Sequence, residues 1–271
     1  MSTMDNPEKG ISGKNEVLLQ TKELTKHFGG VEAVSGFNME IYKREILALI
    51  GPNGAGKTTL FNLITGFYPP TRGKLIFKGE DITHLKPHEI AKKGIVRSFQ
   101  SNILFMDKTV RENVLLGFHS RYKEGIFKEL WGTKSFQKEK REMESKAEEI
   151  MHFLHLLDLK DQLAKNLPHG YQRMLGVAVA FAVRPELLLL DEPVTGMNDD
   201  ETATMMKLVR KIRDQGVTIL LVEHDMKAVM GNCERIVVME YGKKIAEGVP
   251  AEITCNQRVI EAYLGMGVCN A

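Results

Sequence analysis

The chain has 271 residues, with 37 Lys and Arg against 35 Asp and Glu, so its formal net charge is only +2. A protein whose main partner is nucleic acid usually carries a larger basic excess, so this balance argues against DNA or RNA in that role. The three cysteines form no C-x-x-C pair, so they suggest neither a zinc site nor a disulfide framework.

The N-terminal segment is polar and contains Pro7 and Gly10, which predicts a loose tail over residues 1–16. It lacks the apolar stretch of a signal peptide. No run of about eighteen apolar residues, the length needed to cross a bilayer, occurs in the sequence. We therefore expect a soluble protein.

Strand patterns begin after the tail. "VLLQTKEL" from Val17 and "GFNMEIY" from Gly36 alternate apolar and polar residues, as half-exposed antiparallel strands do. "EILALI" at 45–50 is mostly apolar on both faces, which suits a strand covered on two sides. It leads into a glycine-rich segment and then the helix-like "KTTLFNLITGF". "GKLIFKGEDI" predicts another strand and turn, and Pro87 suits the first position of a short helix.

Helical patterns dominate between 101 and 184. In "KSFQKEKREMESKAEEIMHFLHLLDL" the charges between apolar residues predict a solvated helix face. The apolar positions at helical spacing are Met143, Ala147, Ile150, Met151, Leu154 and Leu157.

Strand patterns return after 185. "ELLLLDEP" and "GVTILLVEHD" predict buried strands separated by the helix-like "DDETATMMKLVRKIRDQ". "RIVVMEYGKKIAEG" predicts a hairpin that turns at Tyr241-Gly242. We therefore predict an α/β fold whose parallel core (17–100 and 185–250) has an antiparallel β flank, a helical insertion over 101–184 and a helical tail over 251–271.

"GPNGAGKT" at 51–58, which we call the P-loop, fits the phosphate-binding pattern GxxxxGK[ST] and lies between a predicted strand and a predicted helix. Small residues let backbone N–H groups converge on phosphate oxygens, while Lys57 supplies a positive charge and the Thr58 hydroxyl can ligate Mg²⁺. A chance glycine turn would lack this context. The residues predicted to contact the nucleotide are Gly51, Pro52, Asn53, Gly54, Ala55, Gly56, Lys57, Thr58 and Thr59.

Two acids end the apolar strand "LLLLDEP". A buried parallel strand delivers its C-terminal residues to the crevice where ligands bind. We predict that Asp191 holds Mg²⁺ through water and that Glu192 acts as general base on the attacking water. A solvated strand end would explain the pair equally well by itself; the P-loop favours the catalytic interpretation.

From Val17 onward the sequence resembles the ATP-binding subunits of ABC transporters, and within them the branched-chain amino acid importer group. The segments that carry this likeness are "LTKHFGGVEAV", "NLITGFYPPTRGKLIFKGEDI", "IVRSFQ", "TVRENVLLG" and "DEPVTGMN". The resemblance implies a P-loop NTPase (RecA-like) core, ATP and Mg²⁺ as cofactors, and ATP hydrolysis coupled to transport.

The resemblance also assigns roles to three further residues. Phe28 matches the family's adenine-stacking aromatic, although a buried core phenylalanine is the alternative. Gln100 matches a glutamine that contacts Mg²⁺ and the attacking water, and senses the transmembrane partner. His224 matches the switch histidine that contacts the γ-phosphate and is counted with Glu192 and Gln100 as catalytic.

One motif departs from the family. Its signature reads LSGGQ or LSYGQ, whereas this chain has "LPHGY" from Leu167 to Tyr171. Gly170 keeps a backbone N–H at a helix start for a partner's γ-phosphate. Pro168 lacks the serine hydroxyl, whose hydrogen bond to a charged group is typically worth about 1.5–3 kcal/mol. His169 either compensates as a donor or lies exposed, and we favour exposure. Asn198 replaces the aspartate of many members.

The resemblance implies partners as well. Two ATPase subunits should meet head to tail, as a homodimer or a heterodimer, beside two transmembrane permease subunits at the cytoplasmic face of the membrane and, indirectly, a substrate-binding protein. We expect import of branched-chain or related amino acids; urea or amide import and lipopolysaccharide-type export stay open.

Two other classes of protein share the nucleotide chemistry. A DNA-repair or chromosome-structure ATPase would need long coiled-coil heptads, for which the insertion at 101–184 is too short. A P-loop module that binds ATP without hydrolysing it would not need Glu192 and His224.

Overall fold

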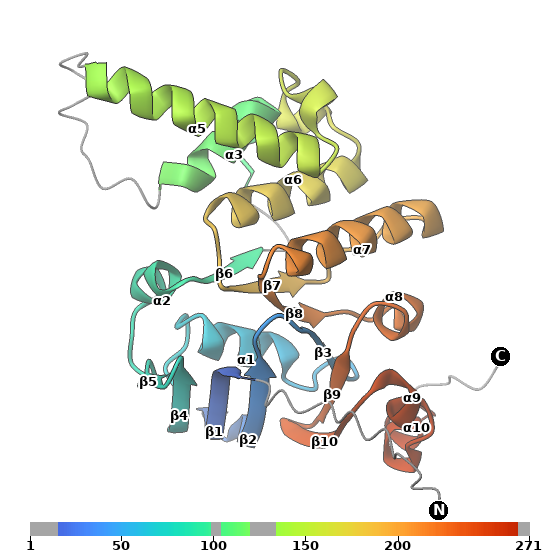
Figure 1. Cartoon of the computed structure of the whole chain (residues 1–271). Coiled ribbons are helices and arrows are strands. Elements are labelled where there is room, and N and C mark those ends of the chain that lie inside the picture. Colours follow the sequence, from blue (N-terminus) through green and yellow to red (C-terminus); the bar gives the residue numbers. More distant parts are fainter. Residues whose placement is uncertain (1–15, 99–103, 120–133, 265–271) are drawn as a thin grey trace, which may run out of the picture.

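Two β-sheets and a layer of helices make up the computed structural model, which describes residues 16–98, 104–119 and 134–264 (Figure 1). The first sheet is antiparallel and confirms the predicted β flank. Its strand order is β2-β1-β4-β5. The strands are β1 (Val17–Phe28), β2 (Val31–Tyr42), β4 (Arg72–Phe77) and β5 (Glu80–Asp81).

The second sheet has the order β10-β9-β3-β8-β7-β6. Its strands run parallel except β10, which pairs antiparallel with β9 at the edge, so the predicted parallel core is confirmed. The strands are β3 (Ile46–Ile50), β6 (Ile95–Ser98), β7 (Leu187–Asp191), β8 (Thr218–Val222), β9 (Arg235–Glu240) and β10 (Lys243–Gly248). Because β3 lies between β9 and β8, its C-terminal end opens in the interior of the sheet.

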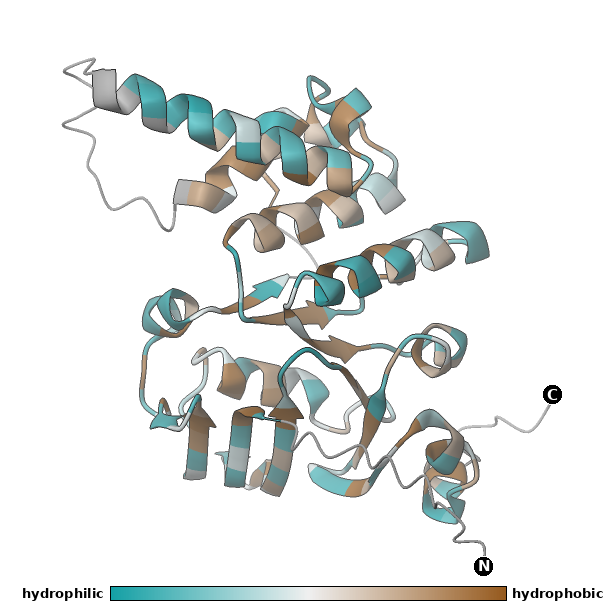
Figure 2. Cartoon of the chain, in the orientation of Figure 1, coloured by the Kyte–Doolittle hydropathy of each residue, from teal (hydrophilic) through white to brown (hydrophobic). Residues whose placement is uncertain are grey.

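The central strands are covered on both faces. Ile46, Ala48 and Ile50 of β3 enter one hydrophobic cluster, which the helical layer covers. Leu47 and Leu49 enter a second cluster, which the antiparallel sheet and α1 (Lys57–Ile64) cover. β7 and β8 alternate in the same way, and Figure 2 shows these strands as mostly hydrophobic. Burial on two faces explains why their sequences are apolar runs rather than alternating ones.

Helices α3, α5 and α6 pack together on one side of the mixed sheet and fall within the predicted insertion at 101–184 (Figure 1). None of the helices in the described ranges is long and apolar enough to cross a membrane. The three helices that pack together are α3 (Val110–His119), α5 (Lys134–Phe153) and α6 (His169–Ala182). The other helices after α1 in the described ranges are α2 (Pro87–Lys93), α7 (Asp199–Asp214), α8 (Met226–Met230), α9 (Pro250–Thr254) and α10 (Gln257–Leu264).

The helix predicted through Leu157 is wrong at its end. α5 stops at Phe153, His155 has a left-handed φ of 56°, and Leu157 opens a short 3-10 turn. Leu154 and Leu156 are both fully buried. In an α-helix, residues two apart point about 200° from each other, so the helix has to end before both can enter one core.

The predicted hairpin turn is confirmed. Tyr241 and Gly242 join β9 to β10 with φ values of 44° and 78°. Two consecutive left-handed residues match the right-handed twist of the strands that they connect.

Candidate functional site

The P-loop joins β3 to α1 and passes so close to its neighbours that two positions exclude a side chain. A Cβ at Gly51 would lie 2.0 Å from the carbonyl oxygen of Met239. Gly56 caps α1 with a φ of 106°, and a Cβ there would lie 2.3 Å from the carbonyl oxygen of Ala33. The glycines of the sequence pattern therefore let the loop pack between β9 and β2.

Lys57 begins α1, and its side chain lies inside the loop. Its Nζ donates to the carbonyl oxygens of Gly51 at 2.6 Å and Pro52 at 2.9 Å. Burial lowers the pKa of Lys57, and the negative charges of Glu192 and Asp191 oppose that shift. Because Gly56 has no capping side chain, the first amides of α1 are available to an anion.

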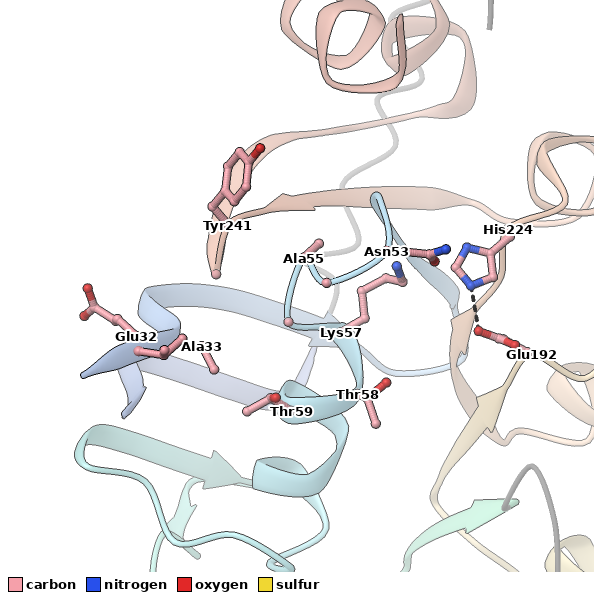
Figure 3. Close-up of a pocket in the computed structure, with 14 residues that line it drawn as sticks. Glu32, Ala33, Asn53, Ala55, Lys57, Thr58, Thr59, Glu192, His224 and Tyr241 are labelled. Carbon is pink, nitrogen blue, oxygen red and sulfur yellow. Dashed lines mark hydrogen bonds and ion pairs between the residues drawn. The ribbon is translucent and has the colours of Figure 1, made fainter. Parts of the chain in front are cut away.

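Glu192 and His224 follow adjacent parallel strands, β7 and β8, so both side chains reach the same edge of the sheet. Glu192 Oε1 lies 2.6 Å from His224 Nε2 (Figure 3). Glu192 has a left-handed φ of 49°, which is uncommon and strained for a residue with a side chain. Such strain persists only where the surrounding structure holds it.

Asp191 ends β7 and is almost fully buried. Its Oδ2 pairs with Arg97 Nη2 of β6 at 2.5 Å, and Arg97 Nη1 donates to Asn62 Oδ1 at 2.7 Å. The sequence analysis missed Arg97, because it assigned no strand to the segment "IVRSFQ" and so placed nothing beside Asp191. The positive charge of Arg97 balances the negative charge of Asp191, and the ion pair holds its carboxylate in one orientation.

These elements enclose a cleft of about 370 Å³. The structure brings the P-loop together with Glu192 and His224, as Figure 3 shows, whereas Asp191 lies outside the lining. The lining residues are Val31, Glu32, Ala33, Asn53, Gly54, Ala55, Gly56, Lys57, Thr58, Thr59, Glu192, His224, Tyr241 and Gly242.

The β9–β10 turn is a side of the cleft that sequence reasoning did not place. Gly242 N donates to Ala55 O at 2.8 Å, and Ser35 N donates to Gly242 O at 2.9 Å. The turn was visible in the sequence, but its contact with the P-loop depends on how β9 packs beside β3.

The helix α10 also reaches the P-loop. The Tyr263 hydroxyl accepts a hydrogen bond from Gly51 N–H, and burial raises the pKa of Tyr263 to about 12. The phenol therefore stays neutral at physiological pH. No pattern in the sequence placed this residue near the P-loop.

Phe28 lies apart from the cleft lining. The residue is 43% exposed, which excludes the core alternative, and its ring meets that of Tyr68 edge-on with centroids 5.2 Å apart. Gln100, the third predicted catalytic residue, lies outside the described residues.

The signature residues do not line the cleft of their own chain. Pro168 caps α6 without a side-chain hydrogen bond, His169 is exposed as expected, and Gly170 is buried. A Cβ at Gly170 would lie 2.9 Å from Oε1 of Glu201, on α7. Asn198 caps α7: its Oδ1 accepts from Glu201 N at 2.9 Å.

Comparison with known proteins gives a consistent result. A family model described as "ABC transporter" matches residues 34–195, and one described as "Branched-chain amino acid ATP-binding cassette transporter" matches residues 243–265. The chain is 43% identical to the high-affinity branched-chain amino acid transport ATP-binding protein LivG of Escherichia coli, over 93% of this chain and 99% of that protein. It is 41% identical to the corresponding BraF of Pseudomonas aeruginosa, over 92% and 98%.

Solved structures agree. The ADP conformation of an ATP-binding cassette of an ABC transporter matches with a TM-score of 0.81 and 33% identity, covering 92% of this chain and 99% of that one. A nucleotide-free cassette matches with a TM-score of 0.80 and 32% identity, over 91% and 98%.

Proposed function

The chain belongs to the ABC transporter family of ATP-binding subunits, and from that premise we propose that it hydrolyses ATP to power import of branched-chain amino acids. The observation that carries the proposal is the contact of Glu192 with His224 across the cleft from Lys57. A carboxylate base, its histidine partner and a phosphate-binding lysine thereby line one space.

The phosphate end of ATP fits the P-loop. Lys57 and the first amides of α1 would contact the β- and γ-phosphates. Because no side chain caps these amides, none has to move away before the phosphates bind. On binding, Lys57 would exchange the carbonyl oxygens of Gly51 and Pro52 for phosphate oxygens. We propose that Phe28 contributes to the base end, from its exposed position beside Tyr68.

ATP would arrive with Mg²⁺, whose charge neutralises the phosphates. The Thr58 hydroxyl would ligate Mg²⁺ directly, and the Asp191 carboxylate would hold the ion through water; oxygen donors of this kind are those that Mg²⁺ prefers, so the residues fit the ion. Gln100, outside the described ranges, completes the proposed ligands. The ion pair with Arg97 holds Asp191 in place.

Glu192 is the proposed general base. Its carboxylate would accept a proton from the attacking water, and His224 would orient that carboxylate through the 2.6 Å contact while reaching the γ-phosphate. Thr195 Oγ1 donates to the other oxygen of Glu192 at 3.3 Å, which further limits its rotation.

A second ATPase subunit completes the proposed site, in a homodimer or a heterodimer. Pro168, His169 and Gly170 begin α6 outside their own cleft, and the uncapped amides of α6 would meet a phosphate bound to the other subunit. Two transmembrane permeases and an external substrate-binding protein would complete the transporter, with this chain peripheral on the cytoplasmic face. The names of the relatives and the match at 243–265 support the amino-acid substrate.

Calorimetry of the purified chain with magnesium ATP tests the premise. Lys57→Ala should weaken binding by at least about a hundredfold, because it removes a buried charge from the phosphates. Lys43→Ala is the control, since Lys43 pairs with Glu16 at the surface. Equal affinity in the wild type and Lys57→Ala would overturn the site. Loss of labelled leucine uptake in cells deleted for the chain tests the substrate.

A further inference from the structure

Glu223 follows β8 one residue before His224, and its burial is unusual for a carboxylate. It is 1% exposed, and no ion pair joins it to a cation within the ranges that the structure describes. Burial raises the pKa of Glu223, and three backbone N–H groups oppose that shift. A buried carboxylate without a countercharge is costly, so its hydrogen bonds have to offset that cost.

The two oxygens of Glu223 serve two different loops. Oε1 accepts from the backbone N–H of Val194 at 2.8 Å, in the loop that follows β7. Oε2 accepts from the backbone N–H of His224 at 3.1 Å, in the loop that follows β8. Asp225 N–H also donates to the carboxylate. One side chain therefore ties together the backbones of the two loops that carry Glu192 and His224.

Glu192 needs such support because of its backbone. It has a left-handed φ of 49°, and its N–H is held on the strand side by Val222 O at 2.9 Å. Two residues later, Val194 is fixed by Glu223. The bend at Glu192 is thus held by hydrogen bonds on both sides. The distance between Glu192 and His224 is therefore set by backbone contacts as well as by the contact of the two side chains.

We propose that Glu223 is a positioning residue for ATP hydrolysis: it bridges the loops after β7 and β8 and so holds Glu192 against His224. The inference rests on the proposed ATPase activity. In the variant Glu223→Asp, the carboxylate would be one methylene too short to reach both loops. In the variant Glu223→Gln, one acceptor oxygen would remain, and the new NH₂ group would face a backbone N–H donor.

The test compares Glu223→Gln and Glu223→Asp with the wild-type chain. We expect kcat for magnesium ATP to fall between about tenfold and about a hundredfold in both, since a misplaced base loses the geometry of proton transfer. KM and the calorimetric Kd for ATP should change less than about twofold, because the P-loop is untouched.

Glu45→Gln is the matched control. Glu45 is also buried, accepts from Tyr42 N at 2.7 Å and pairs with Arg235, away from the cleft. Its kcat should stay at the wild-type value even where stability falls. Amide hydrogen exchange adds a readout that needs no activity: Val194 and His224 should exchange faster in Glu223→Gln and unchanged in Glu45→Gln.

Several results would overturn the proposal. The first is a wild-type kcat in both Glu223 variants, and the second is full activity in Glu223→Asp alone, which would make the charge rather than the bridge decisive. The third is a loss of kcat in Glu45→Gln as large as that in the Glu223 variants. The fourth is unchanged amide exchange at Val194 and His224 in Glu223→Gln. An inactive wild type whose Glu223→Gln variant still shows the faster exchange would count against the proposed function and leave the bridge standing.

Discussion

The starts of α1 and α6 are alike in one respect and opposite in another. Gly56 and Pro168 cap these helices without any side-chain hydrogen bond, so both leave their first amides available. α7 begins differently, because Asn198 and Glu201 cap it reciprocally. The N-cap residues of α2 and α9 also make no side-chain hydrogen bond, so an open start is not peculiar to α1 and α6, but these two are the places where phosphate is expected.

The two open starts differ in charge. α1 carries Lys57 inside the P-loop, whereas the Glu201 carboxylate lies beside Gly170 at the start of α6. A negative neighbour disfavours an anion held by α6 alone. The difference fits the proposed two-subunit site, in which α1 would hold the phosphate tail and α6 would add amides to a phosphate bound to the other subunit.

Gly170→Asp should separate the two helix starts most sharply. An added carboxylate would crowd Glu201 and repel the phosphate of a partner subunit. ATP hydrolysis should fall by at least about a hundredfold while the calorimetric Kd changes less than about threefold. Lys57→Ala, in contrast, should lose both ATP hydrolysis and ATP binding.

Gly176→Asp, on the same helix, is the control for Gly170→Asp because a Cβ there meets open space. If Gly170→Asp weakened ATP binding as strongly as Lys57→Ala does, the proposal that α1 binds the phosphates and α6 only contacts those of the other subunit would be refuted.

Pro168→Ser should have a smaller effect, in the favourable direction. A serine hydroxyl could donate to the partner's γ-phosphate, and such a bond is worth about 1.5–3 kcal/mol, or on the order of tenfold and more. ATP-dependent self-association, measured by sedimentation in a Glu192→Gln background, should tighten accordingly. Pro87→Ser, at the start of α2, should leave it unchanged. No tightening would contradict a phosphate contact at α6 in a pair of identical chains.

The smallest effect concerns the charge at α1 without nucleotide. Burial lowers the pKa of Lys57 in the folded chain below its unfolded value of 10.5. At a pH below both values the folded chain has to hold a buried charge, which lowers its free energy of unfolding. Between the two values the folded chain has lost this proton and the unfolded chain still binds it, so stability rises with pH there. Relative to Lys57→Met, the wild type should therefore gain stability over this alkaline window in urea unfolding. A loss of relative stability there would show that the empty loop favours the charged amine.

Much of the site was predictable because its signals are local. The P-loop spacing, the acids after "LLLL" and the turn at Tyr241-Gly242 each depend on a few consecutive residues, and the structure forms the loop, strand and turn there. The end of α5 was not predictable, because it depends on Leu154 and Leu156 sharing a core that other elements build.

The sequence alone predicted which groups would carry the chemistry: backbone amides at two helix starts, one lysine, and acids at strand ends. Only the tertiary structure decided which of them meet. Pairing of β7 with β8 brings Glu192 to His224, the β6–β7 pairing brings Arg97 to Asp191, and burial between two loops gives Glu223 its three backbone donors. The physical reason is that hydrogen bonds and ion pairs act over a few ångströms, and residues far apart in the chain reach that range only after the sheet has set their register.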